Sequence, residues 1–379
     1  MLSDKRGTPR ICNYEYTIMS GKFRMRGGKR IGHEEENMGF TFLKKLPTPA
    51  EIRNQYPIDA AIQELKAKRD QEIRDVFTGK SDKFLAIIGP CSADNEDAVC
   101  DYLLRLRKVQ DKIADKVLII PRVYTNKPRT TGEGYKGMVH QPDPEKAPDM
   151  ASGLRSVRKL HMEALEEFHM PAADEMLYPG NWPYMEDLLS YVAVGARSVE
   201  NQQHRLTVSG FDIPAGMKNP TGGDLTVMMN SITAGQHQHD FIANGYEVKT
   251  DGNPLTHAIL RGSVNRHGNN IPNYHYEDLT RVAYMYEKFQ LKNPAVIVDA
   301  NHSNSGKQWD QQPRIVQEVL HSRSFLPEIK SLVKGIMIES YIEDGNQSIG
   351  NGVYGQSITD PCLGWDKSAA LLYRMADYV

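Results

Sequence analysis

The chain lacks the features that mark membrane proteins and disulfide scaffolds. No apolar run approaches the roughly 18 residues of a membrane-spanning helix, and the residues after Met1 begin no apolar secretory signal. The cysteines are too far apart in the sequence for a disulfide framework. They are Cys12, Cys91, Cys100 and Cys362. We therefore expect a protein with no membrane span in a reducing compartment, most simply the cytoplasm.

An excess of charge of one sign is also missing. The sequence has 46 Lys and Arg against 48 Asp and Glu, for a net charge of −2. A nucleic-acid-binding domain normally carries a basic excess, so this balance argues against a nucleic-acid partner. Gly216, Gly222 and Gly223 match no P-loop or dinucleotide fingerprint, so we expect no nucleotide cofactor.

What the chain does have is a series of short apolar runs that each stop at a reactive or basic side chain. These runs end at Cys91, Arg122, Arg197, Lys218 and Arg261. Buried parallel strands are nearly continuous apolar segments, and a parallel barrel assembles its active site at their carboxyl ends. The pattern therefore predicts an α/β protein with a (β/α)8 TIM barrel.

Strand and helix patterns alternate along the chain, as a barrel requires. Strands are predicted at 84–89, 117–122, 171–175, 191–197, 212–218, 239–243, 256–261, 294–299 and 335–340. Helices are predicted at 59–77, 95–114, 152–169, 185–190, 222–234, 275–291, 308–322 and 367–377. Nine strands exceed the eight that a barrel needs, so either 239–243 or 256–261 is expected to belong partly to a small β-hairpin decoration. The barrel is predicted to span 46–379.

Residues 1–45 differ from the barrel because basic residues dominate them. Gly27-Gly28 lies between two basic segments, where a two-residue turn needs a positive φ. We expect a basic N-terminal arm that contains a β-hairpin and lies on the barrel or on a neighbouring subunit, with an interface or regulatory role.

Four potential metal ligands follow predicted barrel strands. Cys91, His302, Glu339 and Asp360 are expected to meet over one barrel mouth. A thiolate, an imidazole and two carboxylates suit a borderline divalent ion such as Mn, Fe, Co or Zn, whereas calcium and magnesium sites use oxygen alone. His237 and His239 have a metal-like H-x-H spacing, but they lie on the opposite side of the barrel, so we interpret them as structural.

A group of cations at the same mouth indicates a ligand with more than one negative group. Its predicted members are Arg122, Lys127, Arg129, Arg197, Lys218 and Arg261. Arginine binds phosphate or carboxylate through a bidentate fork, while lysine supplies a compact charge.

These motifs, in this order, resemble the metal-dependent type I 3-deoxy-D-arabino-heptulosonate 7-phosphate (DAHP) synthases, over about 46–379. The matching segments include IIGPCS, PRVYTNKPRTT, PAADE, GARSVENQQHR, DANHSNS and SITDPCLGW. Two details depart from the family pattern. Ala93-Asp94 replaces an apolar residue followed by His-Asp, and DANH replaces the common DFSH. Neither change moves a ligand.

The resemblance implies condensation of phosphoenolpyruvate with D-erythrose 4-phosphate and water, the first step of the shikimate pathway. Cys91, His302, Glu339 and Asp360 would bind the metal, with Cys91 and His302 also taking part in catalysis. Phosphoenolpyruvate would be held by Arg122, Lys127, Glu175, Arg197, Lys218 and Arg261. Arg129 and Thr130 would bind the phosphate of erythrose 4-phosphate. The general acid and base for the addition of water to C2 are not assigned, and Lys127 and a metal-bound water are both candidates for that step.

Two other enzyme activities stay open at this point. One is a 3-deoxy-sugar-acid 8-phosphate synthase that uses arabinose 5-phosphate, and the other is a Schiff-base aldolase with Lys218 as its nucleophile. The resemblance also implies a homodimer or homotetramer. Residues 177–184 and Asp212 lie where relatives bind an aromatic amino-acid effector, but the effector, if there is one, is not specified.

Overall fold

The computed structural model describes residues 39–129 and 131–379, and within these Pro47–Val379 form one compact unit. The predicted hairpin at Gly27-Gly28 lies outside the described residues. The part of the arm that is described, 39–45, contains no helix or strand.

Eight parallel strands form the centre of this unit. They are β1 (Phe84–Gly89), β2 (Val117–Pro121), β3 (Ala173–Glu175), β4 (Tyr191–Val194), β5 (Ala215–Lys218), β8 (Thr256–Leu260), β11 (Val296–Asp299) and β12 (Val333–Glu339). Their order in the sheet is β2-β1-β12-β11-β8-β5-β4-β3. The two end strands meet through a parallel bridge between Arg122 and Ala173, where the Val123 N–H donates to the Ala173 carbonyl at 2.9 Å. The predicted barrel is therefore confirmed, in a nearly closed form.

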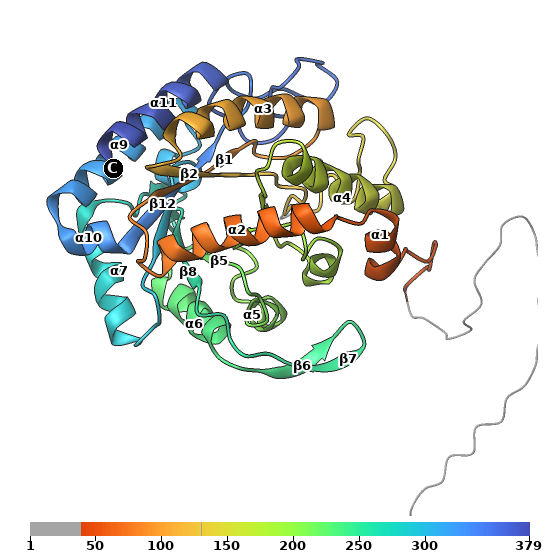
Figure 1. Cartoon of the computed structure of the whole chain (residues 1–379), viewed down its shortest axis with the longest axis horizontal. Coiled ribbons are helices and arrows are strands. Elements are labelled where there is room, and N and C mark those ends of the chain that lie inside the picture. The colour runs from red at the N-terminus through yellow and green to blue at the C-terminus, as the bar shows by residue number, and fades with distance from the viewer. Residues whose placement is uncertain (1–38, 130) are drawn as a thin grey trace, which may run out of the picture. The chain divides into compact units, whose positions relative to one another are not determined.

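Helices surround the strands (Figure 1). The longer ones are α2 (Ala60–Phe77), α3 (Glu96–Ile113), α4 (Met150–Glu166), α6 (Leu225–Gln236), α7 (Tyr276–Lys288), α9 (Gln312–Phe325) and α11 (Trp365–Tyr378). The shorter ones are α1 (Pro49–Gln55), α5 (Gln202–Val208), α8 (His302–Ser305), α10 (Pro327–Leu332) and the 3-10 helices η1 (Pro179–Tyr184) and η2 (Trp309–Gln311). No helix in 39–129 or 131–379 combines the length and the apolar character needed to cross a membrane.

Strand residues alternate between two apolar cores. On β1, Phe84, Ala86 and Ile88 pack toward the helices, whereas Leu85 and Ile87 point into the barrel. This alternation follows from the two-residue period of a strand. The last turn of α2 joins the inner core through Ile73, Val76 and Phe77 and so covers one end of the barrel. In Figure 1 this helix crosses in front of the strands.

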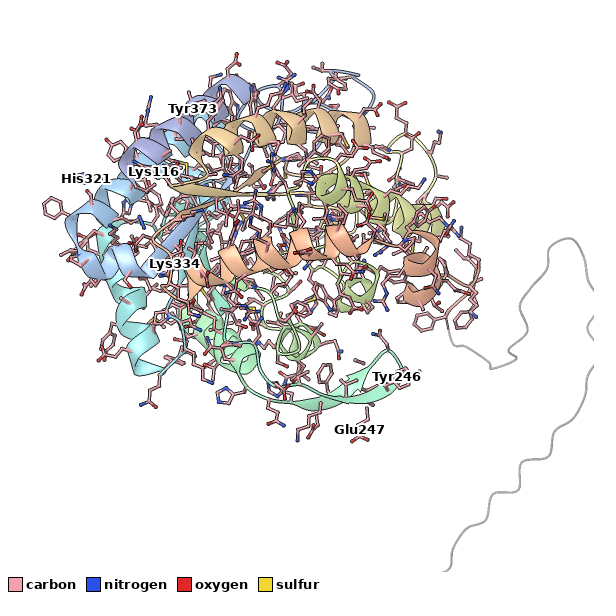
Figure 2. All side chains as sticks on the ribbon, in the orientation of Figure 1. Lys116, Tyr246, Glu247, His321, Lys334 and Tyr373 are labelled. Carbon is pink, nitrogen blue, oxygen red and sulfur yellow. The ribbon has the colours of Figure 1, made fainter. Side chains whose placement is uncertain are left out.

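The ninth predicted strand belongs to a separate β-hairpin. Residues 239–243 form β6 (Asp240–Ala243), which pairs antiparallel with β7 (Tyr246–Lys249) outside the barrel. Tyr246 and Glu247 on this hairpin are exposed (Figure 2). A second small antiparallel pair joins β9 (Ser263–Val264) to β10 (Asn270–Ile271).

One predicted helix is wrong. Residues 185–190 form turns, and the helical segment lies just before them as η1. Pro183 lies inside η1, and a proline restrains the residue before it from the α region. The remaining residues before β4 are too few for a stable α-helix.

Candidate active site

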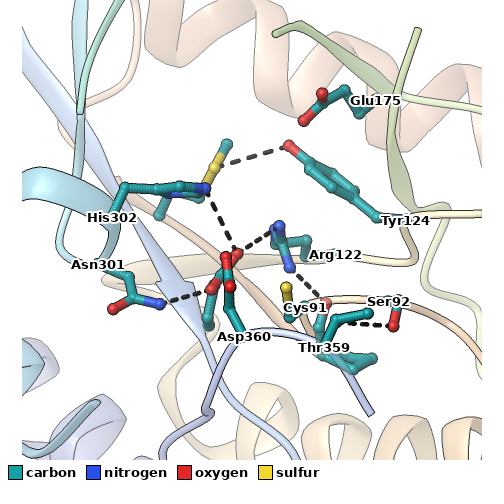
Figure 3. A network of polar contacts seen from close by, with 12 residues as sticks. Cys91, Ser92, Arg122, Tyr124, Glu175, Asn301, His302, Thr359 and Asp360 are labelled. Atoms are coloured by element: carbon teal, nitrogen blue, oxygen red, sulfur yellow. Dashed lines mark hydrogen bonds and ion pairs between the residues drawn. The ribbon is translucent and has the colours of Figure 1, made fainter. Parts of the chain in front are cut away.

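Three potential metal ligands converge at the carboxyl ends of the strands. Cys91 follows β1, Glu339 ends β12, and Asp360 lies in the loop between β12 and α11. Ligand atoms of these three side chains all lie within 4.8 Å of one another. Figure 3 shows Cys91 and Asp360 beside Arg122 and His302 at this mouth.

His302 completes the group. Its Nε2 lies 3.9 Å from Glu339 Oε1, and its Nδ1 contacts Asp299 Oδ2 at 2.8 Å. A histidine held by a carboxylate through one nitrogen presents the other to a metal in many metal sites. The backbone of His302 has a φ of +43°, a left-handed conformation that is costly for a residue with a side chain and is concentrated at functional sites.

Neighbouring charges and burial shift the pKa values of the three potential ligands in opposite directions. Burial and the nearby Glu339 carboxylate raise the pKa of Cys91, while Lys127 works against this rise with its Nζ at 2.9 Å from Sγ. Burial alone would raise the pKa of Glu339, but Arg122, His302 and Lys127 together lower it. Arg122 Nη2 lies 2.7 Å from Glu339 Oε1. The pKa of Asp360 falls to about 2, since Lys127 and Lys307 overcome its burial.

Neutral side chains hold the cluster in place. Gln312, fully buried, donates to the Glu339 carbonyl at 2.8 Å and accepts from the Glu339 N–H at 2.9 Å. Asn301 donates to the second carboxylate oxygen of Glu339. Ser92 and Thr359 share a hydrogen bond of 2.9 Å, which ties the loop of Cys91 to the loop of Asp360. These contacts fix the spacing of the potential ligands before any ion binds.

A donor set of one thiol, one imidazole and two carboxylates at this spacing is compatible with a transition-metal ion or zinc. The close approach of Lys127 and Arg122 does not conflict with such an ion, because each cation is paired with a carbonyl or carboxylate as well. The described residues therefore contain a possible metal-binding group.

The second part of the site is a set of buried cations. Lys218 ends β5 and lies 3.1 Å from Glu175 Oε2, and both side chains are almost fully buried. Gly195 makes room for this pair, because a Cβ there would lie 2.4 Å from Glu175 Oε1. Arg261 follows β8, and its Nη1 is buried with no hydrogen-bond partner among the described residues. Arg122 Nε is likewise buried with no hydrogen-bond partner among the described residues.

Unsatisfied donors of this kind are costly unless a ligand accepts from them. Burial lowers the pKa of Arg261, and the nearby charge of Arg197 contributes to this lowering. Asp299, Glu175 and Glu339 oppose this lowering, yet Arg261 Nη1 and Arg122 Nε still lack hydrogen-bond partners among the described residues. An anionic ligand would complete the site.

The remaining predicted residues lie toward the rim. Arg197 is exposed, and Arg129 is half-buried, with its Nε donating to the Tyr135 carbonyl at 2.8 Å. Thr130 lies outside the described residues. His237 and His239 contact the Thr233 and Ala234 carbonyls of α6, away from the cluster, in keeping with their interpretation as structural.

Several residues that support the cluster are not predicted from the sequence. Asp299 and Asn301 lie inside the DANHSNS motif, Asp299 as the last residue of β11 and Asn301 two positions later, so the end of a predicted strand is the signal that finds them. Gln312 and Lys307 carry no such signal, because one lies at the start of α9 and the other follows α8. Their roles depend on side-chain direction rather than on sequence spacing.

The fold and the site define a class of protein. A parallel (β/α)8 barrel whose carboxyl end combines buried cations with a thiol, imidazole and carboxylate cluster is an enzyme scaffold for a polyanionic substrate.

Comparisons with known proteins identify the family within this class. Residues 55–373 match the model of the DAHP synthetase I family. Phospho-2-dehydro-3-deoxyheptonate aldolase of Haemophilus influenzae is 36% identical over 339 residues, covering 87% of this chain and 91% of that protein. The Phe-sensitive aldolase of Escherichia coli is 33% identical, over 92% of this chain and 99% of its own length.

A solved structure agrees. The phospho-2-dehydro-3-deoxyheptonate aldolase of Francisella tularensis superposes with a TM-score of 0.84 and 29% identity, covering 90% of this chain and 98% of the other. The chain therefore belongs to the DAHP synthetase I family and is an enzyme of that family.

Proposed function

We propose that this barrel condenses phosphoenolpyruvate with D-erythrose 4-phosphate and water to give DAHP and inorganic phosphate. The observation that carries the proposal is the buried group of Arg122, Lys218 and Arg261 beside the cluster of Cys91, Glu339 and Asp360. Phosphoenolpyruvate has a carboxylate and a phosphate, and their charges match donors that the protein itself leaves without acceptors.

In this assignment Arg122, Lys127, Arg197, Lys218 and Arg261 bind phosphoenolpyruvate. Glu175 orients Lys218 through their ion pair. Arg129 and Thr130 bind the phosphate of erythrose 4-phosphate at the rim. Holding both substrates in register is worth about 7–11 kcal/mol in favourable cases, so positioning supplies much of the rate enhancement.

Cys91, His302, Glu339 and Asp360 would hold one divalent ion. Such an ion supplies Lewis-acid polarisation of the aldehyde oxygen of the second substrate. Its identity among Mn, Fe, Co and Zn is open to metal analysis of the purified protein.

The reaction balances as follows. C3 of phosphoenolpyruvate forms a carbon–carbon bond with the aldehyde carbon, water adds at C2, and the bond between C2 and the phosphate oxygen breaks to release phosphate. Lys127 lies 2.9 Å from the Cys91 thiol and 2.7 Å from its carbonyl. It is the residue of this chain that we assign to proton transfer at the aldehyde oxygen.

The test is an assay of phosphate release with both substrates present. We expect activity that chelation abolishes and Mn²⁺ restores. Faster turnover with arabinose 5-phosphate than with erythrose 4-phosphate would instead assign the activity of a 3-deoxy-sugar-acid 8-phosphate synthase. A covalent adduct on Lys218 after borohydride treatment would replace the metal mechanism by a Schiff base, although the ion pair with Glu175 argues against a free amine there.

The relatives include Tyr-, Trp- and Phe-sensitive enzymes, so we also propose an aromatic amino-acid effector. In the segment where it is expected, Trp182 of η1 stacks on Phe211 with ring centroids 3.9 Å apart. Adding each aromatic amino acid to the assay in turn identifies the effector. Sizing chromatography tests the proposed homodimer or homotetramer and the interface role of the arm, and cell fractionation tests the cytoplasmic location.

A further inference from the structure

A single aromatic ring lies beneath two of the buried cations. Tyr124 follows β2 inside the barrel and is completely buried. Its ring centroid is 3.7 Å from the guanidinium carbon of Arg122 and 5.4 Å from the ammonium nitrogen of Lys218. Both distances are within the roughly 6 Å at which a cation and an aromatic face attract. Figure 3 shows Tyr124 between Arg122 and Glu175.

The hydroxyl group of Tyr124 does not account for this position. Its hydrogen bond in the described part of the chain goes to the Met337 sulfur at 3.6 Å, and a thioether is a weak acceptor. Burial raises the pKa of Tyr124 well above its ordinary value, so the side chain stays a neutral phenol. The useful part of the residue is therefore the face of its ring.

Arg122 and Lys218 need such a neutral partner. Each pairs with one carboxylate, Glu339 for Arg122 and Glu175 for Lys218. A further carboxylate would hold the cations more strongly, but it would compete with an anionic substrate for the same N–H donors. A ring face attracts a cation without accepting its hydrogen bonds, so the donors stay free.

We propose that Tyr124 is a positioning residue whose ring face sets the spacing of Arg122 and Lys218 for phosphoenolpyruvate. The inference rests on the proposed function. The substrate does not need to touch the ring, because the effect passes through the two cations. Loss of the ring leaves two buried like charges less well held.

Substitution at two matched tyrosines separates this role from packing. Tyr124→Leu is expected to raise the dissociation constant of phosphoenolpyruvate roughly 5- to 30-fold, the range for a desolvated cation–π contact. Tyr124→Phe keeps the ring and most of the affinity. Tyr191 is equally buried inside the barrel and bonds to His257 instead of a cation. Tyr191→Leu is expected to lower the melting temperature without changing this dissociation constant.

The decisive experiment keeps the ring and changes only its electrons. The starting protein is the Tyr124→Phe variant. The phenylalanine introduced there is replaced in turn by its 4-fluoro, 3,5-difluoro and 3,4,5-trifluoro analogues, and phosphoenolpyruvate binding is measured by calorimetry. Each fluorine weakens the negative face of the ring and changes its size little, so phosphoenolpyruvate affinity is expected to fall stepwise across the series.

Equal affinity across the fluorinated series would overturn the proposal and leave Tyr124 as a packing residue. That outcome is distinct from failure of the proposed function, in which the unmodified protein itself binds no phosphoenolpyruvate and both proposals fall.

Discussion

The two ends of the barrel interior use polar side chains in opposite ways. At the amino end, Tyr191 donates to His257 at 2.8 Å, and the other ring nitrogen of His257 contacts the Leu255 carbonyl at 2.8 Å. Phe77 from α2 packs on His257 with ring centroids 4.4 Å apart. The side chains of this group are neutral, and their polar atoms have partners among the described residues.

The carboxyl end is charged and incomplete. Arg122 Nε and Arg261 Nη1 are buried without a partner among the described residues, and Lys127 lies against a thiol whose pKa is raised by burial. Each such group costs stability in the free protein. The comparison indicates that the amino end stabilises the fold, whereas the carboxyl end stores its unsatisfied groups for a ligand.

The largest expected effect is a loss of turnover caused by a substitution at the carboxyl end of the barrel. Cys91→Ala should reduce metal-dependent turnover about 1000-fold, since an ion at a reacting oxygen contributes several kcal/mol. The thiol is buried and accepts from Lys127 at 2.9 Å, so the substitution should also lower the free energy of unfolding of the metal-free protein by about 1 kcal/mol, through a small cavity and a lost hydrogen bond. Metal content and steady-state rates are the measurements, and Cys100→Ala on α3 is the matched control. Full activity in a metal-stripped Cys91→Ala protein would contradict the assignment.

The next largest effect is a change in KM that differs between the two substrates bound at the carboxyl end. Arg129→Ala should raise the KM for erythrose 4-phosphate by roughly 10- to 100-fold, the loss of a charged hydrogen bond, with a smaller change for phosphoenolpyruvate. Arg129→Lys keeps the charge but loses the fork and should lie between the two. Equal increases in both KM values would remove Arg129 from the second phosphate site.

The two ends also differ in how far the sequence predicts them. The barrel can be predicted from the sequence because strands buried on both faces are short apolar runs. The ends of these runs also predict the site residues Cys91, Arg122, Lys218, Arg261 and Glu339. The amino end gave no such signal. His257 lies inside an apolar run, and Phe77 ends a helix whose charged faces dominate its pattern, so their meeting depends on tertiary packing.

Side-chain direction explains the other gaps. Tyr124 lies within the PRVYTNKPRTT motif, but its sequence position predicts no role, because a tyrosine after a strand can equally be a core residue. Its contact with two cations follows from the closure of the barrel, which brings β2 and β5 side chains to one interior. The helix predicted at 185–190 failed for a local reason, since Pro183 fixes the chain in η1.

A smaller effect tests the neutral amino end through pH. Burial lowers the pKa of His257 to about 4, below the value near 6.5 of an unfolded chain. The unfolded state therefore binds more protons between these values, so His257 contributes stability that is complete above about pH 6.5 and is lost as the pH falls toward 4. We expect a loss of about 2 kcal/mol over this window. Urea unfolding measures it, and His257→Phe should flatten this part of the profile. An NMR titration that places the His257 pKa above 6 would contradict the neutral-end interpretation.

The smallest effect has the opposite slope and belongs to the loop that follows β1 at the carboxyl end. Asp94 Oδ1 is buried without a partner in the described residues, and burial raises the pKa of this carboxyl to about 7. Here the folded state binds the extra proton, so stability falls as the pH rises from about 4 to 7. Asp94→Asn should match the parent near pH 4 and exceed it by about 1 kcal/mol at pH 8, a figure reduced for partial solvent exposure.

Asp143 lines the same cavity as Asp94 but is paired with Lys146 at 2.8 Å. Asp143→Asn should therefore leave the slope between pH 5 and 8 unchanged, which makes it the matched control. If Asp94→Asn is no more stable than the parent at pH 8, the unpaired carboxylate costs nothing, and the contrast between a satisfied amino end and a strained carboxyl end must rest on Arg122 and Arg261 alone.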